Sequence, residues 1–375
     1  MAEQTTHMPT WLRVGVVPLV NLSMALLVSG LIFWIIGENP IEAVKLMVYG
    51  AFGYQEAIGY TLFYATNFIF TGLAVAVAFH AGLFNIGGEG QAYVGGLGMA
   101  LMALAFDDVL PVVLLVPLCI VSGAVFGAAW AAVPGWLQAY RGSHIVITTI
   151  MFNFIASALM GYLLVSVLIA PGSMAPETRK FTDAASIPYL YEMAAWFGIE
   201  VSRSPANGSL IIALLCAVAV WLYIWRSPSG YALRTVGFSE RAASYAGIDA
   251  RKVTVITMCI SGALAAMMGL NEILGTQHSL LLNFTAGYGF TGIAVSLMGR
   301  NHPVGIVLAS LLFGALYQGG AELAFDMPRV TREMVVAIQG LVILFSGALA
   351  YMSEPWVAWV YGKLIGKRVI VEGAV

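Results

Sequence analysis

The chain has 375 residues, of which 60% are hydrophobic and only 10% are charged. An ordinary soluble domain carries about 25% charged residues, so this composition argues against a soluble globular protein and for the lipid bilayer as a partner. The formal net charge of −2 and the short basic stretches argue against nucleic acid as a partner.

Apolar segments about 20 residues long follow one another along the chain, and each matches the thickness of a bilayer's hydrocarbon core. They do not alternate in the way that strands of a membrane β-barrel do. The predicted helices cover residues 14–36, 58–79, 91–106, 110–137, 145–170, 209–226, 253–274, 304–320 and 334–352, with a short Gly-rich span at 287–298. We expect an all-α transmembrane bundle of about ten spans that forms one domain over residues 1–375.

The distribution of basic residues predicts the orientation, because Lys and Arg gather in cytoplasmic connections. With a cytoplasmic N-terminus, most Lys and Arg residues fall on the inner side and most acidic residues on the outer side. Both termini then lie in the cytoplasm, which requires an even number of crossings and favours ten.

Two connections are longer than a turn needs to be. The outer one, at about residues 171–208, contains four prolines and amphipathic stretches that can cap the bundle or meet an outside partner. The inner one, at about residues 227–252, contains Ser239 as a predicted N-cap and Gly247 as a predicted helix end. Ala242 and Ala243 allow close approach, so this short helix is either a docking element or an ordinary surface helix.

A short internal repeat suggests two related halves. The segment TGLAV at residues 71–75 recurs as TGIAV at residues 291–295, and each opens a Gly-rich stretch that leads into another helix. Transporters are often built from two related halves with broken helices at their interface.

The Gly-rich connection at residues 81–91 combines four glycines with Asn85, Glu89 and Gln91. Non-helical backbone at membrane depth survives only where protein buries it or where it lines water. A carboxylate there is costly and usually functional. The alternative is a tight turn at the inner face with a solvated Glu89.

Other polar residues lie within predicted spans, where they can line a pathway for a polar solute or form hydrogen bonds between helices. We predict a substrate pathway that includes Asn67, Thr71, Asn85, Glu89, Gln91, Asn153 and Asn271.

The sequence shows no sign of a catalytic centre. No His, Cys and carboxylate cluster has the spacing of metal ligands, and no nucleophile has a neighbouring base. The GxGxxG pattern at residues 287–292 lies between membrane helices and lacks the downstream acid of a dinucleotide site. We therefore expect that the chain is not an enzyme and carries no metal and no cofactor.

Taken together, these segments resemble the inner-membrane permease subunits of bacterial ABC importers, in the branch that takes up nucleosides and simple sugars and is related to the ribose-type permeases. The resemblance covers most of the chain and rests on the order and spacing of several blocks. These are GLFNIGGEGQ (82–91), VITTIMFN (146–153), RTVG (234–237), AGI (246–248), GYGFTGIAV (287–295) and GRNHP (299–303).

The resemblance implies alternating access in a bacterial inner membrane, with ATP hydrolysis on a separate ATPase subunit. It also implies an extracytoplasmic substrate-binding protein and a second permease subunit, which we expect to be a related but different chain. The inner loop would be the coupling helix that docks on the ATPase. Its predicted contact residues are Ser239, Glu240, Ala242, Ala243, Tyr245 and Gly247.

Nucleosides are the predicted substrates, and permeases for ribose-like sugars or riboflavin are the alternatives. An ion-coupled secondary transporter is a further alternative, but it needs carboxylates deep in the membrane. Only Glu89, Glu272 and Glu322 lie near the predicted spans, and they lie towards span ends.

Overall fold

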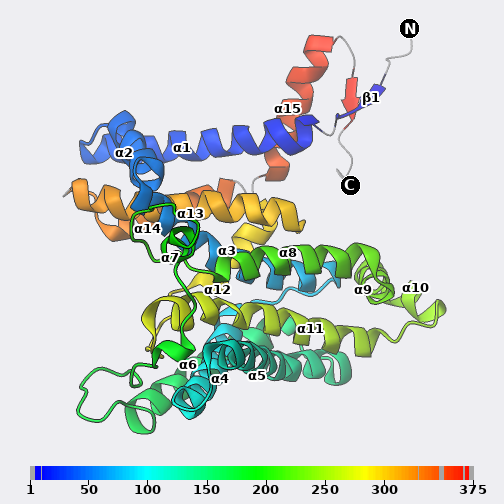
Figure 1. Ribbon diagram of the computed structural model, residues 1–375. Helices are drawn as coiled ribbons and strands as arrows, with labels where there is room; N and C mark the ends of the chain where they lie inside the picture. Colours follow the sequence, from blue (N-terminus) through cyan, green and yellow to red (C-terminus); the bar gives the residue numbers. More distant parts are fainter. Residues whose placement is uncertain (1–4, 10, 328, 346–349, 366–367, 371–375) are drawn as a thin grey trace. The chain divides into compact units, whose positions relative to one another are not determined.

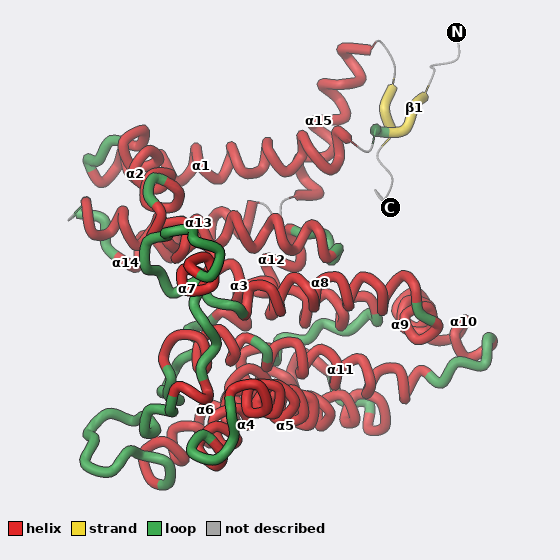
Figure 2. Tube along the Cα trace, in the orientation of Figure 1, coloured by secondary structure: helices red, strands yellow, loops and turns green. Residues whose placement is uncertain are grey.

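The computed structural model describes residues 5–9, 11–327, 329–345, 350–365 and 368–370. Helices make up most of this part of the chain (Figure 2), which confirms the predicted all-α fold. The strands found in these ranges are β1 (Thr5–His7) and β2 (Arg368–Ile370), which pair in parallel.

The chain forms two compact units. The terminal unit consists of Met1–Gly50 and Leu316–Val375, and the central unit consists of Ala51–Ala315. The expectation of one domain over residues 1–375 stays a prediction.

The terminal unit contains η1 (Leu12–Val16), α1 (Val17–Ile36), most of α2 (Pro40–Phe52), the second half of α13 (Pro303–Asp326), α14 (Arg332–Ile343) and α15 (Ala350–Ile365). α1 ends at Gly37, which adopts a left-handed conformation with φ 85°. Within this unit α2 and α13 approach closely, because a Cβ atom at Gly319 would overlap the backbone of Met47.

The central unit contains the longer helices α3 (Gln55–His80), α4 (Gly88–Phe106), α5 (Val112–Arg141), α6 (Ile145–Ser166), α8 (Ser209–Arg226) and α11 (Ala250–Ala266), and the short helix α12 (Tyr288–Met298). Its smaller elements are η2 (Asp183–Ala185), α7 (Leu190–Ala195), α9 (Pro228–Phe238), α10 (Glu240–Tyr245) and the π-helix η3 (Leu270–Gln277).

Small residues bring the helices of the central unit close together. α5 and α11 lie side by side (Figure 1), and a Cβ atom at Gly127 or Gly262 would overlap the carbonyl oxygen of the other. Such contacts let backbones approach where the lipid gives no hydrophobic driving force between helices. α3 is the most buried of the long helices, with buried residues from Ala57 to Ala78.

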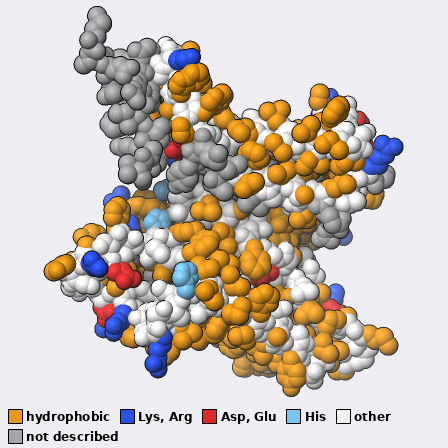
Figure 3. Space-filling view, turned by 180° about the vertical axis from the view of Figure 1, so that it is seen from behind, with side chains coloured by type: hydrophobic (Ala, Val, Ile, Leu, Met, Phe, Trp, Pro, Cys, Tyr) orange, Lys and Arg blue, Asp and Glu red, His pale blue; other side chains and the backbone are white. Residues whose placement is uncertain are grey.

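Seven helices in the described ranges are long and apolar enough to cross a membrane, and they cover Leu19–Ile36, Gln55–His80, Val112–Arg141, Ile145–Ser166, Ser209–Arg226, Ala250–Gln277 and Pro303–Asp326. Hydrophobic side chains accordingly cover much of the face shown in Figure 3. The predicted span 91–106 is α4, a Gly-rich helix of 19 residues. The predicted span 334–352 falls on α14 and α15, with residues 346–349 outside the described ranges. The total of ten crossings stays a prediction.

The two segments of the sequence repeat pack against each other. A Cβ atom at Gly292 in α12 would lie 2.6 Å from Cβ of Thr71 in α3, and one at Gly72 would lie 3.1 Å from Cγ1 of Val295. The repeated glycines, Gly72 and Gly292, therefore allow α3 and α12 to pack closely in a single contact. This contact explains the similarity of the two segments without requiring two related halves.

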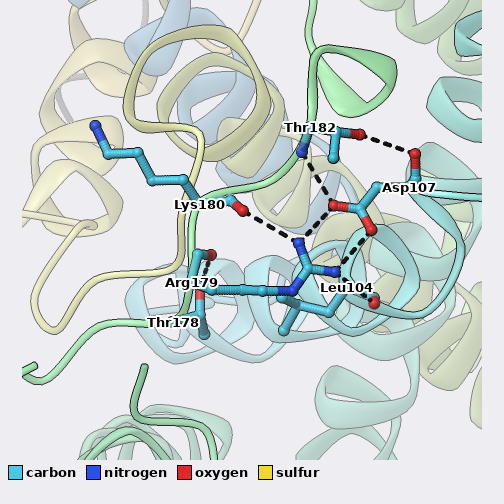
Figure 4. A network of polar contacts seen from close by, with 6 residues as sticks. All are labelled: Leu104, Asp107, Thr178, Arg179, Lys180 and Thr182. Atoms are coloured by element: carbon cyan, nitrogen blue, oxygen red, sulfur yellow. Dashed lines mark hydrogen bonds and ion pairs between the residues drawn. The ribbon is translucent and has the colours of Figure 1, made fainter. Parts of the chain in front are cut away.

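The long loop at residues 171–208 lies at one end of the central unit, and α10 lies at the other (Figure 1). Arg179 anchors this loop to the end of α4 through both oxygens of Asp107, at 2.7 and 2.8 Å (Figure 4). Thr182 adds a backbone N–H bond of 3.0 Å to the same carboxylate. The Arg179 guanidinium therefore holds the pKa of Asp107 below its usual value, with a smaller contribution from Thr182.

Candidate functional site

The Gly-rich segment between α3 and α4 is folded into the protein. Its Asn85 amide donates to Ser261 Oγ at 2.8 Å and to Gln91 Oε1 at 3.0 Å, and its oxygen accepts from the Gly87 N–H at 2.9 Å. Asn85 and Gln91 are each only 1% exposed. The contacts of these two side chains fix the loop against α11.

Asn153 holds the same segment from α6. Its amide donates to the carbonyl of Ile86 at 2.9 Å, and its oxygen accepts from the Gly90 N–H at 2.9 Å. Gly90 permits this contact, because a Cβ atom there would lie 2.8 Å from the Asn153 oxygen. The first turn of α4 is thus bound to α6 by its backbone.

Glu89 binds the beginning of α12. Its Oε1 accepts from the Gly287 N–H at 2.9 Å, and its Oε2 accepts from the Gly289 N–H at 2.8 Å. The first amides of a helix have no partner within the helix, and a negative charge there also interacts favourably with the helix dipole. Glu89 therefore caps α12 from a site 198 residues away in the sequence, which does not fit a solvated turn.

α12 is too short to cross a bilayer. Its 11 residues span about 16 Å, roughly half of the hydrocarbon core. The turn at its C-terminal end contains Arg300, a residue type that marks the membrane surface. Its N-terminus lies against Glu89 in the first turn of α4.

A cavity of about 380 Å³ opens beside this contact, and we call it the Glu89 cavity. Its volume falls within the range of small-molecule sites. It is lined by Glu89, Gly90, Tyr93, Ile150, Asn153, Phe154, Ser157, Asn283, Thr285, Ala286, Gly287 and Phe290. Of the predicted pathway residues, Glu89 and Asn153 line this cavity, whereas Asn67, Thr71, Asn85, Gln91 and Asn271 do not.

Asn67 and Asn271 belong to a separate, closed set of hydrogen bonds, which we call the Asn271 network. Asn271 donates to Asn67 Oδ1 at 2.8 Å and to the carbonyl of Phe63 at 2.9 Å. Asn67 in turn donates to Glu272 Oε1 at 2.6 Å. Asn207 and Ser209 both donate to Asn271 Oδ1.

The π-helix η3 carries Asn271 and Glu272 towards α3. Glu272 is 5% exposed, although the sequence places it near the end of a span. Thr71 contacts this region only through its own helix, since its hydroxyl donates to the carbonyl of Asn67. The contacts of Asn67 and Asn271 join α3, η3 and the start of α8.

The predicted coupling residues form α10 and its ends. The Ser239 hydroxyl accepts from the Ala242 N–H at 3.3 Å, and Gly247 closes the segment with φ 77°. Glu240 and Ala242 are exposed, whereas Ala243 is fully buried. Tyr245 is 95% exposed and Phe238, which precedes the N-cap, is 96% exposed. An exposed aromatic side chain therefore lies at each end of the α10 segment, Phe238 before its N-cap and Tyr245 as its last residue.

The end of α9 touches the beginning of the Gly-rich segment. A Cβ atom at Gly237 would overlap the carbonyl of His80, and one at Gly82 would lie 3.4 Å from the Gly237 backbone. The α9–α10 segment thus meets the chain seven residues before Glu89.

Sequence reasoning missed Tyr93, Asn283 and Phe290 in the cavity and Phe238 beside α10. Tyr93 follows Glu89 by four residues, so helical spacing places both on one face and could have indicated it. Phe238 stands directly before a predicted N-cap, where an exposed aromatic residue is unusual. No local pattern links Asn283 to α4.

Comparison with known proteins places the chain in a family. The model of the family described as branched-chain amino acid transport system / permease component matches residues 57–347. The guanosine ABC transporter permease protein NupP of Bacillus subtilis is 36% identical, over 93% of this chain and 96% of the relative. The nucleoside ABC transporter permease protein NupB of Lactococcus lactis is 33% identical, over 89% and 90% of the two chains.

The glucose ABC transporter permease protein TsgB13 of Haloferax volcanii is 34% identical, over 90% of this chain and 88% of the relative. Each of these three organisms also has a second, less similar permease, with 26–29% identity to this chain. The chain therefore belongs to the family of branched-chain amino acid transport system permease components, and it is a multi-pass permease of the ABC-importer type.

Proposed function

We propose that this chain carries nucleosides into the cytoplasm by alternating access, as the membrane-spanning subunit of an ATP-driven importer. Two relatives at 33–36% identity are named for guanosine or nucleoside transport, and this similarity carries the proposal. A glucose permease at 34% identity makes a sugar the second candidate substrate. A probable riboflavin permease at 25% identity gives weaker support for riboflavin as the substrate.

The substrate path runs past Glu89 and Asn153, the two predicted pathway residues that line the Glu89 cavity. The residues that line it in the described part of the chain include no Lys, Arg or His, which suits an uncharged solute. The contacts of Asn67, Thr71, Asn85, Gln91 and Asn271 favour a supporting role, in which they hold the helices that form the path.

The α9–α10 segment docks on a separate ATPase subunit. The exposed side chains of Phe238 and Tyr245 support this role, because buried aromatic anchors dominate protein interfaces. Ser239 and Gly247 shape the helix, and Glu240 and Ala242 complete its exposed surface. The buried Ala243 supports the helix from within.

Both termini and the α9–α10 segment face the cytoplasm, and the loop at residues 171–208 faces outward. This arrangement follows from the positive-inside rule and from the position of the loop and α10 at opposite ends of the central unit (Figure 1). The outward loop receives a substrate-binding protein. A second permease completes the pore, and the paired permeases of three relatives' organisms favour a different chain over a second copy.

The test of this proposal is ATP-dependent uptake by the complete importer in proteoliposomes. We expect uptake of labelled nucleoside that requires both this chain and the ATPase. Uptake that survives removal of the ATPase but not of this chain would identify a secondary carrier instead.

The docking surface is tested by Tyr245→Ala and Phe238→Ala. Loss of an aromatic anchor is expected to weaken ATPase binding about 30-fold, the equivalent of about 2 kcal/mol. Trp196→Ala is the matched control, because Trp196 is an exposed aromatic residue just after α7 in the long loop. The measurement is ATPase affinity for the solubilised permease pair, and wild-type affinity in both the Tyr245 and the Phe238 variant would disprove the docking assignment.

A further inference from the structure

We propose that the Glu89 cavity is a binding site for the base of an uncharged nucleoside, and that Asn283, oriented by Tyr93, recognises the base. This inference rests on the proposed function, because it takes nucleosides as the substrate. It adds the residues, the part of the ligand that they contact and the reason why charged nucleotides are rejected.

Aromatic side chains from three elements line the cavity, and Phe154 and Phe290 offer exposed surfaces, whereas Tyr93 is only 4% exposed. Tyr93 of α4 stacks on Phe284, with ring centroids 5.3 Å apart and an angle of 19° between the planes. Phe154 of α6 and Phe290 of α12 also line the cavity and are exposed. Stacking on aromatic side chains suits any base, because every base has a π-face. A sugar alone would use these surfaces less well.

Asn283 provides a hydrogen-bond donor with a fixed orientation. The Tyr93 hydroxyl donates to Asn283 Oδ1 at 2.7 Å, so that the amide oxygen already has a partner. The Nδ2 group has no partner among the described residues, and Asn283 is exposed on the cavity lining. Bases present carbonyl oxygens and ring nitrogens as acceptors on their edges. The Asn283 amide is placed to donate to such an acceptor.

The backbone that presents Asn283 is strained. Asn283, Ala286 and Gly287 have φ values of 60°, 45° and 81°, all in the left-handed region. Asn and Gly tolerate this region, but Ala does so only at a cost. Strained backbone of this kind clusters at ligand sites, where surrounding contacts maintain it. Here the contacts come from α4, through Glu89 to Gly287 and Tyr93 to Asn283.

The charge of the lining explains the choice of an uncharged ligand. Among the described residues, Glu89 is the one charged side chain that lines the cavity, and its two oxygens accept from Gly287 and Gly289. A nucleoside phosphate would bring a second negative charge next to Glu89 with no cationic side chain on the lining. Like charges held in a site of low dielectric repel strongly. The site therefore accepts nucleosides and rejects their phosphates.

The experiment compares Asn283→Gly with the matched variant Asn301→Gly. Asn301 also has a positive φ, 55°, and its oxygen accepts from the Ser296 hydroxyl at 2.8 Å, but it lies outside the cavity. Glycine keeps the left-handed backbone in both variants and removes only the amide. Tyr93→Phe is the third variant, since it keeps the stacked ring and removes the hydroxyl that orients Asn283.

Initial rates of ATP-dependent uptake are measured for guanosine, uridine and ribose with the complete importer. We expect Asn283→Gly to lower guanosine uptake about tenfold and to change the guanosine-to-uridine ratio at least threefold. Tyr93→Phe should shift the same ratio in the same direction by a smaller factor. Asn301→Gly should leave the ratio at its wild-type value. Guanosine monophosphate should not compete with guanosine in any variant.

The outcomes separate this inference from the proposed function. If the wild-type importer takes up none of the nucleosides, the proposed function fails. If it takes them up and Asn283→Gly behaves like Asn301→Gly, the base site is wrong while the proposed function stands. Should Asn283→Gly fail to assemble, the ratio measured with Tyr93→Phe decides, and an unchanged ratio overturns the inference.

Discussion

The Asn271 network and the Glu89 cavity have similar side chains and different surroundings. Each combines asparagines with one glutamate inside the helical bundle of the central unit. In the network, Asn67 and Asn271 are fully buried, and their amide groups are bonded to other protein groups. In the cavity, Glu89 and Asn153 are also bonded, but they lie beside a space of about 380 Å³.

This difference shows what residue type alone does not reveal about a membrane helix. A polar side chain in a span must find a partner, and both clusters satisfy that requirement. Only the cluster beside an open space can also meet a solute. The comparison therefore predicts that changes in the network affect folding, whereas changes in the cavity affect transport.

The largest effect is expected from Asn271→Ala. The substitution removes four hydrogen bonds, which join Asn271 to the carbonyl of Phe63 and to the side chains of Asn67, Asn207 and Ser209. At about 1 kcal/mol for each hydrogen bond, the free energy of unfolding should fall by about 4 kcal/mol. Thermal unfolding of the purified protein in detergent measures the loss. Wild-type stability together with slow uptake would contradict this and place Asn271 in the pathway.

A smaller effect is expected from Glu89→Gln. The amide has one acceptor oxygen for the two N–H groups of Gly287 and Gly289, and its own NH₂ faces the other donor. Uptake should fall about tenfold, the equivalent of about 1.4 kcal/mol, because the start of α12 moves. Gln91→Ala is the control two residues further along the same helix, and it should reduce stability more than transport. Equal uptake by Glu89→Gln and wild type would contradict the comparison.

The smallest effect concerns pH and the ion pair of Asp107 and Arg179. Because the pKa of Asp107 is lower in the folded chain than in the unfolded chain, the pair stabilises the fold at neutral pH. This contribution begins to decline near the unfolded pKa of about 4 and is lost as the pH falls through the lower folded value. We expect a loss of only about 1 kcal/mol, since Arg179 is partly exposed.

Unfolding at pH 7 and at pH 3 measures that loss, with Asp107→Asn as the matched variant. The stability of Asp107→Asn should depend less on pH than that of the wild type. An identical pH dependence in the two proteins would show that the ion pair contributes nothing.

Most of the fold could be predicted from the sequence, because apolar segments of span length have few alternatives to a membrane helix. The loop and cap residues around α10 were also predictable, since Ser239 and Gly247 are strong local signals. The exposed and buried sides of α10 were not, because six residues are too few to show a periodic pattern. Ala243 is therefore buried where the sequence suggested a contact residue.

The candidate site was only partly predictable for a different reason. Glu89 stood out because a carboxylate among glycines is rare in a membrane protein. Its partners Gly287 and Gly289 lie about 200 residues away, and no local pattern connects them with Glu89. Asn271 was indistinguishable from Asn153 in the sequence, because burial by tertiary packing decides which of them borders a cavity.

The contact between Gly237 and the turn at His80 and Gly82 has a mechanical consequence. Main chain meets main chain there, because neither Gly237 nor Gly82 has a side chain to place between the segments. Side chains can change rotamer and so accommodate a movement of the neighbouring segment, whereas hydrogen-bonded backbone deforms very little. A displacement of α9 therefore moves the Gly-rich segment by nearly the same amount. The contact couples the end of α9 rigidly to the end of α3.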